Sequence, residues 1–396
     1  MKKCFFGAIA VLALASCSNE KVVELSQDQE IKFTVEAGKA TSRAADGYCH
    51  ATLPAEFDVW AKQGTSNYFA AEPFKQSGSI WVINTEDKRY WPANALQMFA
   101  MKNYLGDETT KATVTWDATQ EKPLKVNNFI VPNAVGSQKD FIYAVNAAAT
   151  KDANTLNFRH GLAEVVFRAQ NLNPNIYVEV TGVKVMNVQN KGTFTFPKES
   201  TSDNNLDIDN PQENAFIGAR GTWEVTTGSL DSYTVTFDKV EVAQKGTDGN
   251  QAAPASLTYD FKSTNERYNA NSLYLMEQQG TTTWDGNAAL KNAGAYKTDC
   301  GAYLILTCSI WNVAAGDGTK ATGTDVKLWD NKDIAVKLPS LAWIHGYKYV
   351  YTFKFTKDGN GGTDPETDKP VFTPIELTVD VDDFVNETNQ DVPMVR

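Results

Sequence analysis

Alternation between apolar and polar residues near the carboxyl end constrains the fold of this chain more than any other feature of its sequence. Aromatic residues occupy the odd positions of residues 347–355, and a second alternation covers residues 375–382. Successive side chains of a β-strand point to opposite faces, so both segments are predicted to be strands with one apolar face against a core. The Gly-, Asp- and Thr-rich residues 357–369 are predicted to form the loop between them.

Shorter apolar runs, broken by turn residues, recur along the rest of the sequence, and long helical patterns are scarce. This spacing predicts an all-β chain of antiparallel β-sandwich sheets. In one run the apolar parity changes across Gly182, from Val178 and Val180 to Val183 and Val185, which predicts a β-bulge. The runs are residues 57–61, 79–83, 96–101, 112–116, 141–146, 162–168, 177–188, 233–237, 272–276, 303–311 and 333–338.

The length of 396 residues leaves room for two domains at about 150 residues each. Residues 198–212 are rich in Ser, Asn and Asp and form the predicted linker or long loop. We therefore predict two β-sandwich domains in tandem, over residues 44–200 and 201–396, the second ending in a tail.

The first residues have the pattern of a bacterial lipoprotein signal. Lys2 and Lys3 precede an apolar run over residues 5–15 that is too short to span a bilayer as a permanent helix. Residues 14–17 read LASC, and the thiol of Cys17 is the predicted lipidation site. The sequence therefore predicts a signal peptide over residues 1–17 and a lipid-anchored precursor. The alternative is an ordinary secretory signal with a chance cysteine.

A strand pattern follows the signal, and a polar loop follows the strand. Residues 38–47 are small or polar and are predicted to be an accessible loop that a protease could cut. The odd positions before this loop carry the apolar residues of the predicted strand, Val23, Leu25, Ile31, Phe33 and Val35.

Three cysteines remain once Cys4 has left with the signal and Cys17 is lipidated, namely Cys49, Cys300 and Cys308. If Cys300 and Cys308 share one strand, they lie about 26 Å apart at ~3.3 Å per residue, far beyond the ~6 Å that a disulfide tolerates. We interpret them as small buried hydrophobic residues. The alternative is a disulfide from Cys49 to either one.

The charge and the chemical groups exclude several function classes. A net charge of −11 disfavours nucleic acid as a partner and electrostatic docking on an anionic membrane. His50, His160 and His345 are scattered and lack metal-ligand spacing. Residues 358–369 begin like a calcium loop, yet the twelfth is Lys369, where a bidentate Glu is required. We predict no catalytic residues, no metal site, no cofactor and no enzyme activity.

Five motifs in the order of the chain resemble the fimbrillin family of Bacteroidetes-type pili, the type V pilus subunits. The chain departs from the family at Glu277, where a proline is more common, and at Phe384 and Val385, where a tryptophan is frequent. The motifs are RYWP at 89–92 with LQMFA at 96–100, QKDFIYA at 138–144, FRHGLAEV at 158–165, LYLMEQ at 273–278, and HGYKY at 345–349 with VDVDDF at 379–384.

The resemblance implies two transthyretin-like β-sandwich domains, export as a lipoprotein to the outer membrane, and a mature form in cell-surface fimbriae that serve adhesion. It also implies that an arginine-specific protease removes an N-terminal strand, whose place an extended segment of a neighbouring subunit then takes. In this sequence we predict a propeptide over residues 18–43, cut between Arg43 and Ala44. The removable strand would carry Ile31, Phe33 and Val35. The alternative for Arg43 is a surface arginine in a flexible tether.

The segment given to the neighbour is predicted in the C-terminal tail, where Val392, Met394 and Val395 follow a polar spacer. Pro393 lacks an amide proton and would interrupt a paired strand, so the alternative is a tail that merely frays. The expected partners are other copies of the chain and related pilus subunits.

Two other functions stay open at this point. A non-polymerising anchor or tip subunit would keep both the strand before Arg43 and the lipid. A surface glycan-binding lipoprotein would gather exposed Trp and Tyr residues on one face. Most of the nine tryptophans, however, lie in strand-like runs, where core packing is the expected use.

Overall fold

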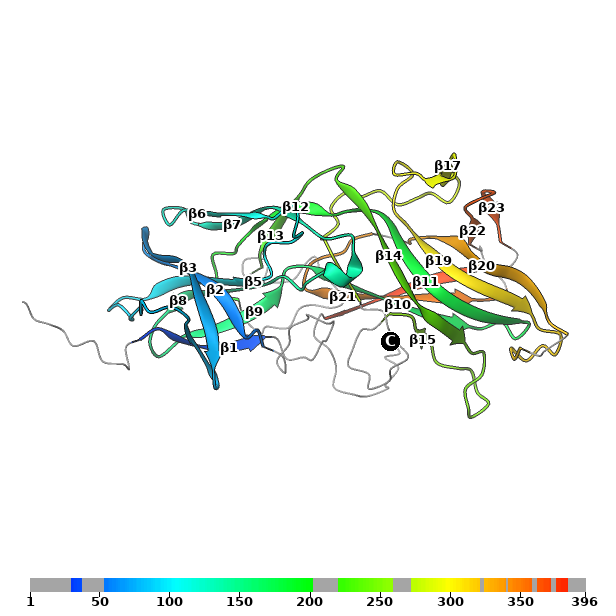
Figure 1. The fold of residues 1–396 in the computed structure, drawn as a ribbon, viewed down its shortest axis with the longest axis horizontal. Helices are drawn as coiled ribbons and strands as arrows, with labels where there is room; N and C mark the ends of the chain where they lie inside the picture. The colour runs from blue at the N-terminus through cyan, green and yellow to red at the C-terminus, as the bar shows by residue number, and fades with distance from the viewer. Residues whose placement is uncertain are drawn as a thin grey trace, which may run out of the picture.

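The computed structural model describes residues 30–37, 53–201, 220–258, 272–320, 324–339, 341–357, 362–371 and 375–383. Over these residues the chain is all-β, and its only helical element is the 3-10 turn η2 (Val135–Ser137). The molecule is elongated, with strands of the first half at one end of the long axis and most strands of the second half at the other (Figure 1). The described part contains no helix long and apolar enough to cross a membrane.

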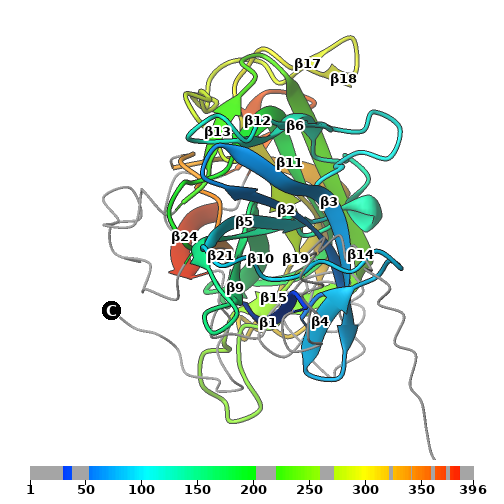
Figure 2. The same ribbon diagram turned by 90° about the vertical axis from the view of Figure 1, so that its left-hand side faces the viewer.

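Seven strands of the first half close into a barrel. They pair in the order β1, β4, β3, β2, β5, β8, β9, and β9 pairs back to β1, as the view along the long axis shows (Figure 2). The barrel encloses its own cluster of buried side chains, among them Phe33, Phe57, Phe74 and Trp81. The strands are β1 (Lys32–Ala37), β2 (Glu56–Gln63), β3 (Ser66–Ser77), β4 (Ile80–Ile83), β5 (Leu96–Lys102), β8 (Ile142–Ala149) and β9 (Thr155–His160).

Two larger sheets at the other end share one core. One has the order β15, β10, β21, β24, with β16 also beside β10, and the other has the order β14, β11, β19, β20, β22, β23. Val165 and Tyr351 from the first sheet and Val183 and Leu306 from the second belong to one buried cluster, so the sheets pack against each other. The strands are β10 (Ala163–Asn171), β11 (Ile176–Gln189), β14 (Leu230–Val242), β15 (Ala255–Ser256), β16 (Leu273–Leu275), β19 (Tyr303–Asn312), β20 (Val326–Lys337), β21 (Tyr347–Phe355), β22 (Thr363–Asp364), β23 (Lys369–Pro370) and β24 (Ile375–Asp383).

A four-stranded sheet of order β13, β12, β7, β6 lies toward the middle of the long axis (Figure 1). Its residues Val126, Phe194 and Trp223 belong to the same buried cluster as the two large sheets. The two ends of the molecule are therefore joined by packed side chains. The strands are β6 (Thr113–Trp116), β7 (Leu124–Ile130), β12 (Lys191–Thr195) and β13 (Thr222–Val225), and a short hairpin pairs β17 (Lys291–Asn292) with β18 (Ala295–Tyr296).

The strand predictions from apolar runs are confirmed, since every predicted run overlaps a strand. The bulge predicted at Gly182 is confirmed by a register shift between Val180 and Gly182 toward both neighbouring strands. The predicted loop 357–369 also contains β22 and the first residue of β23, and residues 358–361 lie outside the described part of the chain. In β21 side chains of both faces are buried, including Lys348 and Thr352 on the polar face. The alternation there identifies the apolar face correctly, but the polar face is not exposed.

The all-β prediction is confirmed, but the purely antiparallel one is wrong for two pairs. Strand β1 runs parallel to β9, and β10 runs parallel to β21. Parallel and antiparallel strands have the same side-chain period, so alternation in the sequence carries no signal for strand direction. The likeness of either half to a transthyretin-like sandwich stays a prediction.

Strand pairing crosses the predicted domain boundary at residue 200. Strands β10 and β11 precede it yet pair with β21 and β19, whereas β13 follows it and pairs with β12. Residues 202–219 lie outside the described part of the chain. The division into domains at 44–200 and 201–396 stays a prediction.

Candidate functional site

Strand β1 and the residue before it place three apolar side chains in the barrel core. Ile31, Phe33 and Val35 have exposed fractions of 0%, 1% and 7%. Lys32 is half-buried and Thr34 is exposed, so burial follows the two-residue period seen in the sequence. We call the position between β4 and β9 that β1 occupies the β1 site.

Phe33 is the centre of the contacts that β1 makes. Its ring centroid lies 4.8 Å from that of Phe74, 6.4 Å from that of Phe57 and 6.4 Å from that of Trp91. These rings come from β3, from β2 and from the segment after β4. Aromatic rings at such separations attract one another in addition to burying apolar area, so the β1 site is shaped around a large side chain at position 33.

The backbone pairing of β1 is divided between two strands. Lys32 and Phe33 pair with Val82 and Trp81 of antiparallel β4. Residues 34–37 pair with residues 155–158 of parallel β9. Each half of β1 thus has a ladder on one side, and among the described strands β1 alone closes the barrel between β4 and β9.

Polar contacts fix the start of β1. The Ile31 N–H donates to the carbonyl oxygen of Arg89 over 2.8 Å. The Glu30 carboxylate lies 3.3 Å from the Lys88 ammonium and 3.8 Å from that of Lys32. Both lysines are more than one-third exposed, and such pairs contribute little to stability. Their contribution is to orientation, while the buried side chains supply the stability.

Several predicted functional residues lie outside the described part of the chain: Cys17, Arg43, Ala44, Val392, Met394 and Val395. Cys49 also lies there, so its predicted alternative pairing stays untested. Cys308 is buried in β19, as expected for a small hydrophobic residue, and burial raises its thiol pKa. Cys300 is half-buried and precedes β19, so the two do not share a strand, and no disulfide joins them.

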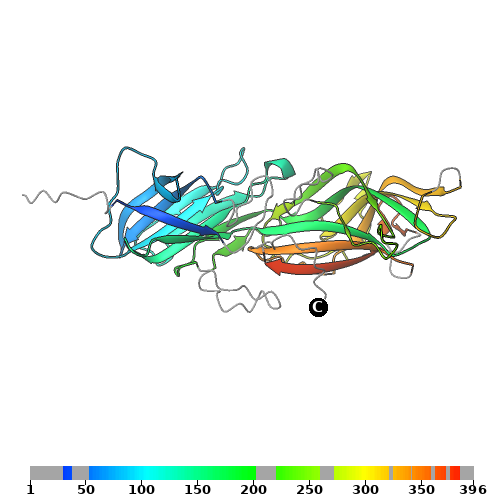
Figure 3. The same cartoon turned by 90° about the horizontal axis from the view of Figure 1, so that it is seen from below.

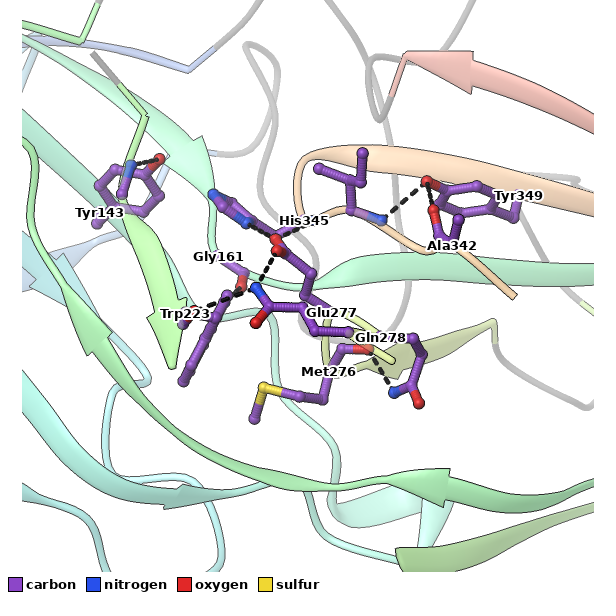
Figure 4. A network of polar contacts seen from close by, with 12 residues as sticks. Tyr143, Gly161, Trp223, Met276, Glu277, Gln278, Ala342, His345 and Tyr349 are labelled. Atoms are coloured by element: carbon purple, nitrogen blue, oxygen red, sulfur yellow. Dashed lines mark hydrogen bonds and ion pairs between the residues drawn. The ribbon is translucent and has the colours of Figure 1, made fainter. Parts of the chain in front are cut away.

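A second polar cluster, at the junction of the barrel and the large sheets, was not predicted as a pair of interacting residues. Nδ1 of His345 lies 2.5 Å from Oε2 of Glu277, and Gln279 donates to Oε1 of Glu277 over 2.7 Å (Figure 4). The imidazole packs 5.8 Å from the Phe194 ring and 6.3 Å from the Tyr143 ring, measured between centroids. The histidine thus belongs to the second half and packs on rings of the first.

Burial determines the ionisation of this cluster. It lowers the pKa of His345 below the ordinary 6.5, although Glu277 acts in the opposite direction. Burial also opposes ionisation of Glu277, but hydrogen bonds and charges from His345, Gln279 and Arg220 lower its pKa to about 2. A fully buried imidazolium is costly, so we assign an ionised Glu277 that accepts the Nδ1–H of a neutral His345. Nε2 of His345 is buried and has no hydrogen-bond partner among the described residues.

The sequence singled out Glu277 only as a departure from the family pattern, and His345 only as part of a family motif and as a histidine without metal-ligand spacing. Residues 68 positions apart have no spacing that would reveal the pair. The other described histidine, His160, lies 2.9 Å from buried Asp140. The described residues contain no group of three His, Cys, Asp or Glu that could hold a metal ion.

The tryptophans lie mostly in the core, as predicted. Six of the nine are buried, and three are half-buried, namely Trp91, Trp116 and Trp329. Trp91 packs on Phe33, and Trp116 and Trp329 lie against the large core. This arrangement does not present the row of exposed tryptophans that a glycan-binding platform would need.

Comparison with known proteins places the chain in a family. The sequence matches the family model described as fimbrillin-like over residues 42–369. A fimbrial protein from Bacteroides vulgatus is 15% identical, with a TM-score of 0.51 over 90% of this chain and 100% of that chain. A proposed cell adhesion protein from Bacteroides uniformis is 13% identical, with a TM-score of 0.42 over 91% and 100%. No protein of curated function matches. Since the family model spans most of the sequence, this chain belongs to the fimbrillin-like family.

Proposed function

We propose that this protein is a structural subunit of adhesive fimbriae that polymerises by strand exchange at the β1 site. The observation that carries the proposal is the burial of Ile31, Phe33 and Val35 in a strand that closes the barrel. The fimbrillin-like family and the fimbrial protein with the same fold support the role of a pilus subunit.

Exchange would begin with a cut between Arg43 and Ala44. The cut separates β1 from the rest of the chain, because residues 38–52 are the covalent connection between β1 and the next described residue. Departure of β1 would leave β4 and β9 with unpaired edges and would uncover the pockets of three side chains. A strand from a second copy satisfies both needs, since sheet edges bind extended segments through main-chain hydrogen bonds.

The side chains supply enough free energy for a lasting connection. Burial of three apolar side chains at about 2 kcal/mol each contributes roughly 6 kcal/mol before ordering costs. The two-residue period fixes the register, because a slip by one residue would place polar side chains in the pockets. The same contacts would keep β1 in place before the cut and hold the precursor as a monomer.

Export would precede assembly. Cys17 would carry the lipid that anchors the precursor in the outer membrane, and removal of residues 18–43 would release the mature subunit from that anchor into fimbriae at the cell surface. Partners are then further copies of this chain and related pilus subunits, together with the arginine-specific protease. A non-polymerising anchor or tip subunit would instead keep both β1 and the lipid.

N-terminal sequencing of protein sheared from cells, combined with electrophoresis of unheated samples, tests the proposal. A first residue of Ala44 in heat-sensitive ladders is the expected result. Arg43→Gln should abolish both, whereas Lys39→Gln in the same segment should change neither. A lipidated Cys17 on a monomer would contradict polymerisation and favour the anchor or tip role.

A further inference from the structure

We infer that the β1 site accepts strands by a short sequence rule, and that the C-terminal tail of a second copy obeys this rule in one register. The inference rests on the proposed function, because it concerns the strand that replaces β1. The rule asks for apolar side chains at positions 31 and 33, with the larger at 33, and is less strict at position 35, the most exposed of the three. It also allows proline at position 32 but excludes proline at position 34.

The side-chain part follows from the pockets. Position 33 faces the rings of Phe57, Phe74 and Trp91, whereas position 35 lies at the more exposed end of the strand. A small residue at 33 would leave a cavity among rings that belong to three segments and cannot all move together. Position 33 therefore discriminates among strands more strongly than position 35.

The backbone part follows from the directions of successive N–H groups. The N–H of Ile31 points to Arg89, on the side where Phe33 pairs with β4. Strand N–H groups alternate in direction, so those of Lys32 and Thr34 point to the other side, toward β9.

The ladder with β9 begins at Thr34, which lies opposite Thr155. The N–H of Lys32 points the same way but precedes this ladder. A residue without an N–H is therefore tolerated at position 32, whereas at position 34 it removes a ladder hydrogen bond. Both side chains point away from the barrel core, so the two positions differ mainly in this N–H.

The tail has one proline, and the rule fixes where it can lie. With Pro393 at position 32, Val392 takes the place of Ile31 and Met394 that of Phe33. With Pro393 at position 31, 33 or 34, a paired N–H is lost. With Pro393 at position 30 or 35, Arg396 or Asp391 enters the pocket of Phe33. One register remains, with Arg396 at the place of Val35.

The length of the tail indicates that the donor is a second copy. Extending the register of β21 with β10 by one residue places Tyr347 beside residue 163, and extending that of β1 with β9 places position 31 beside residue 152. Residues 152 and 163 are eleven positions apart, or at most roughly 36 Å at ~3.3 Å per residue. Figure 3 shows β1 and β24 following one another along the same axis. Asp383 pairs with Tyr347, and the nine residues from there to Val392 span at most about 32 Å. The tail of the same copy would have to be fully extended over these nine residues and then reverse its direction to run parallel to β9, so a second copy is the expected donor.

Peptide competition tests the rule on the full chain cut between residues 43 and 44, with the N-terminal fragment kept in place. Labelled peptides of residues 28–38 compete with that fragment, and their relative affinities are measured. We expect the affinity of the Lys32→Pro peptide to lie within about threefold of that of the native peptide. The Thr34→Pro peptide should bind at least about tenfold more weakly than the Thr34→Ala peptide, and the Phe33→Ala peptide on the order of 100-fold more weakly than the native one. The Thr34→Ala peptide controls for the Thr34–Thr155 hydroxyl contact.

Equal affinities for the Lys32→Pro and Thr34→Pro peptides would overturn the backbone part of the rule, and a tight Phe33→Ala peptide would overturn the side-chain part. Failure of the native peptide itself to exchange would overturn the proposed function and the rule together. The first two results leave exchange at the β1 site intact, so the failures are distinguishable.

Polymer formation tests the register of the tail. Pro393→Ala should leave ladders of the cut full chain unchanged, Met394→Phe should make them more resistant to heat, and Met394→Asp should abolish them. Ladders that survive Met394→Asp would overturn the register. A cut monomer whose own tail is protected from carboxypeptidase would overturn assignment of the donor to a second copy.

Discussion

Phe33 contacts rings from three separate segments, so its removal affects the barrel more than any polar change on β1. We expect Phe33→Ala to lower the free energy of unfolding of the uncleaved protein by about 3–5 kcal/mol, because it leaves a cavity among aromatic side chains. Urea unfolding followed by tryptophan fluorescence measures the change. Lys32→Ala is the matched control, expected within about 0.5 kcal/mol. Equal effects of the two substitutions would show that β1 is not packed as described.

His345 makes the stability of the protein depend on pH. In the unfolded chain its pKa returns to the ordinary 6.5, above the folded value, so the unfolded state binds more protons just below pH 6.5. Stability should therefore fall as the pH decreases below 6.5. Glu277 acts in a separate window, because its pKa of about 2 places its loss of stability between pH 4.5 and 2.

Thermal unfolding of the wild-type protein and of His345→Gln between pH 7 and 5 checks this prediction. The variant should be less stable at pH 7, since it loses the contact with Glu277, but should decline less between pH 7 and 5. His50 and His160 are common to both proteins and cancel in the comparison. Parallel curves would contradict a neutral His345 in the folded state.

At this scale the sequence predicts one site and not the other. Ile31, Phe33 and Val35 lie on one strand, so their shared burial is encoded in local alternation. Glu277 and His345 come together through the packing of two segments that are remote in the chain. Such a pair depends on the tertiary arrangement, for which one sequence gives no periodic signal.

The ring of Phe194 in β12 lies so close to Gly221, the residue before β13, that no side chain fits at position 221. A Cβ atom at Gly221 would lie 1.9 Å from Cζ of Phe194, whose ring is buried among Tyr143, Phe196 and Trp223. We expect Gly221→Ala to destabilise the protein by about 1–3 kcal/mol or more through overpacking.

The matched control is Gly136→Ala, because a Cβ atom at Gly136 meets nothing within 4 Å. Its expected change is within about 0.5 kcal/mol. Differential scanning calorimetry of both variants measures the difference. A small effect at Gly221 would mean that the ring of Phe194 can shift at little cost.

Among the strands, regular alternation separates those that the sequence predicts from those that it misses. Strand β21 is regular and was located within its bounds. Strand β7 was missed because Asn128, at φ 55°, shifts the parity between Val126 and Phe129. Strand β3 contains Pro73 and a positive φ at Ala71, which interrupt its pattern. Irregular backbone conceals a strand from pattern analysis even where tertiary packing stabilises it.

Two buried clusters are the largest in the described part of the chain, and β1 belongs to the barrel cluster alone. Loss of β1 should therefore loosen the barrel while the large sheets stay folded. We expect hydrogen exchange to rise in β4 and β9 of the chain that starts at Ala44, relative to the uncut chain, and to stay unchanged in β19 and β21. Equal loss of protection in all four strands would show that the barrel and the large sheets unfold as one unit.

Tension along a filament would act on the parallel pair of β1 and β9 in a particular way. Strand β9 is followed after two residues by β10, which runs on beside β21 into the other end of the molecule. A force on a donor strand bound at the β1 site would act along β9. The hydrogen bonds between the two strands would then be loaded at the same time and would not break one after another. Paired strands that are loaded in shear resist separation better than strands that are pulled apart one hydrogen bond at a time. This geometry suits a fimbria that holds a cell against flow.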